Sequence, residues 1–178
     1  MAGRSSGIRQ IKSYYQWFRD RKPFMKSNLE KHLVVVAEML RKCTPVHQEF
    51  MSIQEFVLKH GKHYPARKTV ENVPSSTPKE CFKNALELAW SSIEYTYCEG
   101  FISVHGVPIQ HAWCVNKNGL VVDPTIQTPK SDYEYFGVCF NTEFVTKSVL
   151  KRKRYGIIDN PEQRFPLLQG KHEDKVIK

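Results

Sequence analysis

Three residues in the second half of the chain have the types and the order needed for covalent catalysis by a cysteine. Cys81 stands near the start of a predicted helix, His111 in a predicted strand, and Asp123 in the strand that follows. In such a set a thiolate attacks a carbonyl carbon, the imidazole moves the proton, and the carboxylate orients the imidazole. The three residues are therefore a candidate triad acting on an amide or ester.

The sequence TPKEC predicts where the helix of the candidate nucleophile begins. Thr77 is the expected cap, Pro78 suits the first helical position, and Glu80 completes a capping box. This places Cys81 in the first turn, where the positive end of the helix dipole favours a thiolate over a thiol. A buried structural cysteine is the competing interpretation, and placement alone does not separate the two.

The hairpin HAWCVNKNGLVVDPT carries the other two residues. Strand alternation puts His111 and Trp113 on one face, and an aspartate beside the imidazole would hold its tautomer. The alternative without catalysis is an ordinary surface hairpin with a polar edge. Trp113 would shield the site or contact substrate, although packing in the core is the commoner role for such a tryptophan.

The turn of this hairpin decides whether the imidazole and the carboxylate meet. A two-residue turn at the Asn-Gly pair sets His111 opposite Ile126. A three-residue loop over residues 116–118, with Gly119 in a bulge, sets His111 opposite Asp123 instead. The sequence is compatible with both registers, and we expect the second if the triad is real.

Taken together, three segments resemble the core of the transglutaminase-like and papain-like cysteine enzymes. ECFKNALELAW resembles the segment in which a nucleophilic cysteine opens a long helix, and YCEGFISV resembles the strand after it. HAWCVNKNGLVVDPT resembles the His-Ala-Trp, hairpin, Asp-Pro-Thr signature. Arylamine acetyltransferases share this core and triad order, and phage-encoded proteins carry similar segments. The match covers residues 77–126, and TPKEC departs from the usual Gly-x-Cys approach to the nucleophile.

The resemblance implies a cysteine-dependent hydrolase or acyltransferase that works through a thioester. A peptidase, a deamidase and a transglutaminase-like enzyme all fit, with a peptide, a protein side chain or a small amide as substrate. It implies no metal and no other cofactor. The second oxyanion donor is open among Gln54, His63 and Tyr64. An arylamine-type acetyltransferase that uses acyl-CoA is one alternative.

The order of the predicted elements indicates an α+β fold, in which a helical N-terminal half precedes a nucleophile helix packed on an antiparallel sheet. We expect one domain over residues 1–178, with a helical portion (1–70), a catalytic core (77–158) and a tail (159–178) that frays at its end. The predicted helices are 8–20, 27–43 (capped by Ser27 with Glu30), 44–61 (from Thr44-Pro45 to Gly61) and 77–97. The predicted strands are 101–107, 109–115, 120–125 and 135–140, with short helices or coil over 141–157.

Composition and charge bound the remaining possibilities. The five cysteines show no CxxC pair, and no secretory signal is evident, so we expect free cysteines, mostly buried, and a cytoplasmic protein. No apolar run reaches the roughly 18 residues that a membrane span needs. The net charge of +9 clusters in the N-terminal segment and in KRKR. A solvated face explains it, and the alternative is a basic module that binds nucleic acid or an acidic host protein with a non-functional triad.

Overall fold

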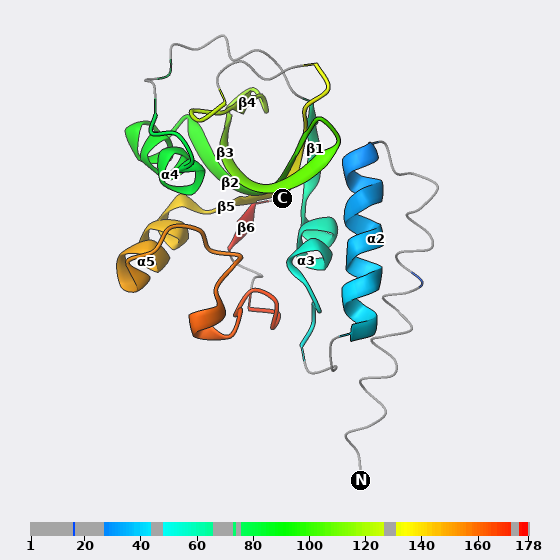
Figure 1. Ribbon diagram of the computed structural model, residues 1–178. Coiled ribbons are helices and arrows are strands. Elements are labelled where there is room, and N and C mark those ends of the chain that lie inside the picture. Colours follow the sequence, from blue (N-terminus) through cyan, green and yellow to red (C-terminus); the bar gives the residue numbers. More distant parts are fainter. Residues whose placement is uncertain are drawn as a thin grey trace.

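The structure, a computed structural model, describes residues 16, 27–43, 48–65, 73, 76–126, 131–171 and 175–177. One antiparallel sheet curls into a half-barrel, and the helices lie around its outer side (Figure 1). The strand order is β1-β5-β2-β3-β4, with β6 paired to β5. The predicted α+β class is confirmed at this level. The elements are α2 (Asn28–Cys43), α3 (Ile53–His60), β1 (Lys62–Pro65), α4 (Cys81–Ser91), β2 (Tyr95–Val104), β3 (Val107–Asn116), β4 (Val121–Val122), β5 (Glu134–Phe140), α5 (Thr142–Arg152), the short 3₁₀ helix η2 (Pro161–Gln163) and β6 (Val176–Ile177).

The two faces of the sheet carry separate cores. The outer face packs against α2, α3, α4 and α5, with Leu33, Phe56, Leu86 and Val145 among the buried side chains. The inner face of the half-barrel holds a smaller aromatic cluster that includes Trp113. This division follows from strand alternation, which sends successive side chains to opposite faces. It confirms that neighbouring residues of the HAWCV strand serve different cores.

Two glycines allow the inner cluster to pack closely. Gly100 lies level with His111 on one side and with Gly137 on the other, so a row without side chains crosses β2 and β5. A Cβ at Gly137 would lie 2.4 Å from Cη2 of Trp113. The indole therefore occupies the space that the missing side chain leaves, and this holds the aromatic cluster against the sheet.

A buried ion pair joins the two N-terminal helices. The Arg41 guanidinium binds the Glu55 carboxylate with both arms, at 2.6 and 3.0 Å, and the Glu55 side chain is fully buried. The Met51 N–H donates to the same carboxylate at 2.7 Å. Such a pair is stabilising only while both charges are matched, because an isolated buried charge is very costly.

The boundaries of the N-terminal helices test the predicted caps. Ser27 caps α2 as expected, its Oγ accepting from the Glu30 N–H at 3.0 Å. The predicted start of the second helix, Thr44-Pro45, lies outside the described residues, but residues 48–52 are not helical as predicted, because α3 begins at Ile53 and its cap is Ser52. Its predicted end at Gly61 is confirmed. The expected helix over residues 8–20 lies outside the described residues, apart from Gln16, which is helical.

Other predicted segments agree with the structure to different degrees. Residues 101–107 are not one strand, because His105 and Gly106 form a tight turn, with φ of 50° and 81°, that joins β2 to β3. Over residues 141–157, where short helices or coil were predicted, the chain forms the helix α5. The end of the predicted tail is not frayed, because β6 pairs with Cys139 and Phe140 of β5.

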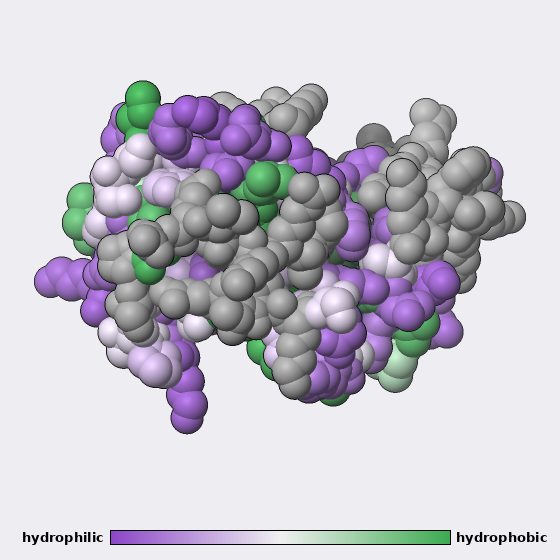
Figure 2. Space-filling model, turned by 90° about the horizontal axis from the view of Figure 1, so that it is seen from above, coloured by the Kyte–Doolittle hydropathy of each residue, from purple (hydrophilic) through white to green (hydrophobic). Residues whose placement is uncertain are grey.

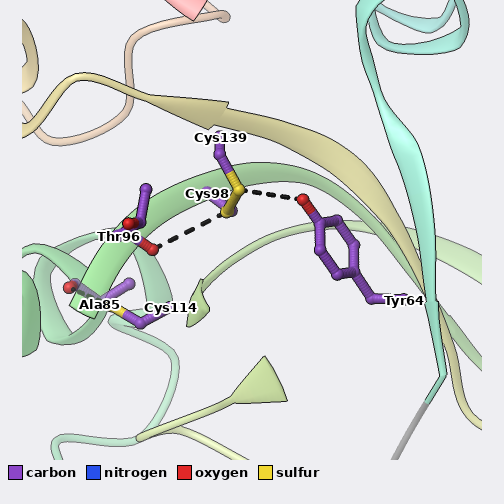
Figure 3. The surroundings of a disulfide bond; sticks show 6 residues. All are labelled: Tyr64, Ala85, Thr96, Cys98, Cys114 and Cys139. Atoms are coloured by element: carbon purple, nitrogen blue, oxygen red, sulfur yellow. Dashed lines mark hydrogen bonds between the residues drawn. A yellow bond between two sulfur atoms is a disulfide. The ribbon is translucent and has the colours of Figure 1, made fainter. Parts of the chain in front are cut away.

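The sequence predicted that all five cysteines are free, and this prediction was wrong for two of them. Cys98 and Cys139 face each other on β2 and β5 and form a disulfide. Figure 3 shows Tyr64 pointing at this bond from β1, with its hydroxyl 3.0 Å from Cys139 Sγ. Cys43, Cys81 and Cys114 remain free thiols, and Cys114 is buried against α4. The expectation failed because motif spacing says nothing about two cysteines that become neighbours only in a sheet.

The face of the molecule drawn in Figure 2 is mainly polar where its residues are described. Seen from above, hydrophilic residues cover most of the visible described surface and hydrophobic residues occur in small groups (Figure 2). None of the described helices is long and apolar enough to cross a membrane.

Breaking the buried ion pair is expected to destabilise the protein. Arg41→Met leaves the Glu55 carboxylate buried without its counter-charge, and we expect the free energy of unfolding to fall by about 3–5 kcal/mol. Chemical denaturation measures this. The matched control is Lys147→Met, which breaks the exposed Lys147–Glu143 pair of α5 and should leave stability unchanged. Equal effects of the two substitutions would contradict this role of the pair.

The disulfide should lower the number of thiols that titrate in the unreduced protein. Thiol titration of the unfolded, unreduced protein should find three free cysteines, and reduction should raise the count to five. Because the bond closes a long loop, reduction should also lower the free energy of unfolding by roughly 4 kcal/mol. Cys43→Ser should lower both thiol counts by one and leave stability unaltered. Five thiols before reduction would show that the bond does not form.

Candidate active site

His111 and Asp123 meet, but through a register that differs from both predicted ones. The Asn116 N–H donates to the Leu120 carbonyl, which closes a three-residue loop with Gly119 at φ 75°. β3 and β4 then pair Val115 with Val121, so Asp123 comes level with a position two residues beyond His111. The loop has the expected length, yet it lies one residue later than predicted.

The displaced register still keeps the two side chains together. The pairing differs from the predicted His111–Asp123 register by two positions, and an even displacement leaves both residues on the same face of the sheet. Diagonal neighbours in a sheet are close enough for longer side chains to touch. Nε2 of His111 lies 2.7 Å from Oδ2 of Asp123, and both side chains are almost fully buried.

The Asp123 carboxylate is held by four hydrogen bonds. Oδ1 accepts from the backbone N–H groups of Thr125 and Ile126, at 2.8 and 2.9 Å, so the chain turns around the carboxylate. Oδ2 accepts from the Tyr135 hydroxyl at 2.9 Å as well as bonding to His111. A buried carboxylate with this many donors is stabilised in its charged form.

The ionisation of the pair follows from these contacts. Burial alone raises the pKa of Asp123, but the bonds to His111, to Ile126 and to Tyr135 outweigh it and hold that pKa below its ordinary value. Burial alone lowers the pKa of His111. The hydrogen bond to Asp123 and the interaction with the Cys81 side chain outweigh it and raise the pKa of His111 to about 9. The imidazolium is therefore favoured near neutral pH.

Cys81 is the first residue of α4, and its side chain lies close enough to the His111 ring to contribute to the raised pKa of His111. Nε2 of His111 is already bonded to Asp123, which leaves Nδ1 for the thiol. The thiol is partly accessible to solvent. The structure thus brings together the cysteine, the histidine and the aspartate that the sequence singled out.

The helix begins later than its sequence suggested. Residues 77–80 form a turn closed by the Glu80 N–H and the Thr77 carbonyl, with Lys79 in the left-handed region at φ 68°. Neither Thr77 nor Pro78 therefore starts the helix, and Glu80 occupies the cap position without a side-chain cap bond. The first helical bond is donated by Asn84, so the N–H groups of residues 81–83 have no acceptor within α4.

Asn84 ties the two halves of the candidate site together. This buried side chain lies one turn after Cys81, and its Nδ2 donates to the Thr77 carbonyl at 2.8 Å and to Thr125 Oγ1 at 3.0 Å. The turn before the cysteine is thereby linked to the turn that wraps Asp123. A cleft of about 240 Å³ runs along the same side of α4, lined by Val73, Ser76, Thr77, Asn84, Glu87, Leu88, Ser91 and Pro124.

Trp113 occupies a packing position beside the imidazole. It is fully buried, its ring stacks near that of His111 with centroids 6.4 Å apart, and the Tyr135 ring meets it edge-on at 5.2 Å. Its indole N–H has no hydrogen-bond partner among the described residues. The contact with substrate stays a prediction, whereas the geometry shows a side chain that excludes water from one side of His111.

Sequence reasoning missed Tyr135. This residue lies in the predicted strand 135–140, where alternation marks it as a core aromatic and nothing marks its hydroxyl as functional. Burial and the charge of Asp123 raise its pKa far above the ordinary value, so the hydroxyl keeps its proton and donates it. Of the three candidate oxyanion donors, Tyr64 points at the disulfide, and Gln54 and His63 are half-buried.

Comparison with known proteins gave no match to a family model, to a curated protein or to a solved structure. Among the described residues, no group of three or more His, Cys, Asp or Glu side chains is arranged to hold a metal ion.

The raised pKa of His111 predicts how stability depends on pH. The folded-state pKa of about 9 lies above the ordinary value of 6.5, so protonated His111 stabilises the fold fully below pH 6.5. This contribution is lost as the pH rises through 9, and we expect the free energy of unfolding to fall by roughly 3 kcal/mol across that window. Denaturation curves at several pH values measure the fall, and NMR titration of His111 locates its pKa.

Two variants separate this effect from general alkaline instability. Asp123→Asn removes the carboxylate that holds the proton on His111, and it should flatten the dependence over the same window. His105→Asn changes an exposed histidine and should leave the profile as it is. A wild-type profile that is flat from pH 6.5 to 9 would contradict the raised pKa.

Proposed function

We propose that this protein is a cysteine-dependent hydrolase or acyltransferase that acts on an amide or ester carbonyl through a thioester intermediate. The observation that carries the proposal is the buried 2.7 Å bond between His111 Nε2 and Asp123 Oδ2, beside Cys81 at an open helix start. It supports a transglutaminase-like or papain-like arrangement of a nucleophile helix on an antiparallel sheet. Peptides, protein side chains and small amides all fit this chemistry.

The first step is formation of the thioester. The proton shared by Cys81 and His111 already lies on Nδ1 of His111, and the Cys81 sulfur forms a bond to the substrate carbonyl carbon. The negative charge then develops on the carbonyl oxygen, where the free N–H of Cys81 and the positive end of α4 would stabilise it. When the intermediate collapses, the carbon–nitrogen or carbon–oxygen bond breaks, and His111 gives its proton to the departing amine or alcohol.

The second step returns the free enzyme. Water, or an amine in a transfer reaction, loses a proton to Nδ1 of His111 as it bonds to the thioester carbon. The carbon–sulfur bond breaks, the acid or the new amide leaves, and the proton stays on Nδ1 of His111, which restores the starting pair. Asp123 stays ionised throughout and holds Nε2, so the same nitrogen of His111 acts in both steps.

The disulfide bears on the location of such an enzyme. Disulfides are rare in a reducing cytosol, which speaks against the expected cytoplasmic location. The sulfurs of Cys98 and Cys139 are buried, however, and burial limits the access of reductants. A cytoplasmic location stays a prediction, and the thiol count of protein isolated under native redox conditions tests it.

The proposal predicts selective alkylation of Cys81. Iodoacetamide near pH 7 should modify Cys81 faster than the exposed Cys43, because the His111 ring lies beside the Cys81 side chain and activates it as a nucleophile. His111→Ala should slow the reaction at Cys81 by roughly tenfold or more and leave the rate at Cys43 unchanged. Peptide mass spectrometry follows both sites in one sample. Equally slow labelling of Cys81 and Cys43 would contradict the proposed function.

A second measurement separates the alternatives. Incubation with acetyl-CoA should leave Cys81 unmodified in a hydrolase of amides, whereas an arylamine-type acetyltransferase accumulates an acetyl group on that sulfur. Retention of nucleic acid at low salt that is unaffected by Cys81→Ser would favour a basic binding module instead.

A further inference from the structure

One edge of the sheet is open immediately before the candidate site. β4 pairs with β3 only at Cys114 and Val115, and within the described residues no strand pairs with the outer edge of residues 107–110. Two apolar side chains on this stretch are exposed, Val107 at 60% and Ile109 at 48%. They stand on the same face of β3 as His111, because alternate residues of a strand share a face.

The β2–β3 turn determines which backbone groups face outward. A two-residue turn makes Val104 and Val107 a hydrogen-bonded pair, so Val107, Ile109 and His111 use their backbone groups on β2. The intervening residues, Pro108 and Gln110, therefore direct theirs away from β2. Proline is tolerated at such an outward position because it removes no bond from the ladder.

Gln110 offers the most hydrogen-bonding groups on this edge. It is exposed, it directly precedes His111, and it presents both a backbone N–H and a carbonyl to the outside. The Pro108 carbonyl is a second acceptor on the same side. Exposed strand edges usually attract another strand, and soluble proteins rarely leave apolar, alternating ones uncovered.

We propose that the outer edge of Val107–Gln110 binds an extended polypeptide substrate as an added strand and leads it to Cys81. This inference rests on the proposed function and assigns its substrate class. A paired chain advances about 3.3 Å per residue, so a peptide bonded to Gln110 reaches the level of His111 within one or two residues. A small acyl donor would have no use for this edge, whereas a peptide backbone complements it.

The geometry also assigns the recognition. The Gln110 N–H donates to a peptide carbonyl, and the carbonyls of Gln110 and Pro108 accept from peptide N–H groups. Val107 and Ile109 offer an apolar surface to alternate substrate side chains, so apolar residues are preferred at every second position. Peptide hydrolysis then follows the steps given above, with water as the co-reactant.

The test uses tripeptidyl fluoromethyl ketones, which alkylate a cysteine with loss of fluoride, and compares them with iodoacetamide. Gln110→Pro removes the outward N–H without touching the β2 pairing, and Gln110→Ala keeps that N–H as the matched control. We expect Gln110→Pro to slow labelling of Cys81 by the best tripeptide reagent about tenfold, with Gln110→Ala close to wild type. Both variants should keep the wild-type rate with iodoacetamide.

A second measurement needs no variant of the protein. In an added strand, successive peptide nitrogens alternate between facing the edge and facing away. Methylation of one peptide nitrogen of the reagent should therefore slow labelling of Cys81, and methylation of the next should not. This keeps the inference testable if Gln110→Pro fails to fold.

The possible failures are distinguishable. Slow labelling of wild-type Cys81 by iodoacetamide would remove the proposed function itself. Fast labelling by iodoacetamide overturns only the strand inference if Gln110→Pro and Gln110→Ala react equally with the tripeptide reagent. Equal effects of methylation at neighbouring nitrogens, or no tripeptide reagent that outpaces iodoacetamide, would overturn it as well.

Discussion

The buried carboxylate of Asp123 is the constraint on which the candidate site depends. A carboxylate removed from water must find other donors, and this one finds four: His111, Tyr135, and the backbone of Thr125 and Ile126. These donors come from β3, from β5 and from the chain after β4. Satisfying one charge therefore determines how three segments lie around a single point, and the orientation of the imidazole follows.

The candidate site combines residues from both faces of the sheet. α4 packs on the outer face, while His111 belongs to the face that lines the half-barrel. Because β4 is only two residues long, no strand of the described part of the chain pairs with β3 just before His111, and Cys81 at the start of α4 interacts with the ring. A longer β4 would pair with this stretch and close the approach. The shortness of β4 thus leaves this edge of β3 unpaired among the described strands, beside the candidate site.

Predictions from local sequence were confirmed where the structural feature depends only on a short segment of the chain. The Ser27 cap and the helical stop at Gly61 depend only on neighbouring residues. The predictions from local sequence were wrong where a residue far along the chain, or a tertiary hydrogen bond, takes the place of the expected local bond. A capping signal at Thr77 gave way to a turn, and the Thr77 carbonyl instead accepts from the Asn84 side chain.

The sequence by itself determined the α+β class and the order of cysteine, histidine and aspartate, whereas the turn decided whether the last two share a face. Residue types and period-two alternation are local properties, so they can be inferred without a fold. Only the tertiary structure decided the remaining features: the register, the Tyr135 hydroxyl on the carboxylate, the Cys98–Cys139 bond and the open edge at Gln110. Each of these depends on which strands become neighbours or on where one ends, and that is determined by packing over the whole chain.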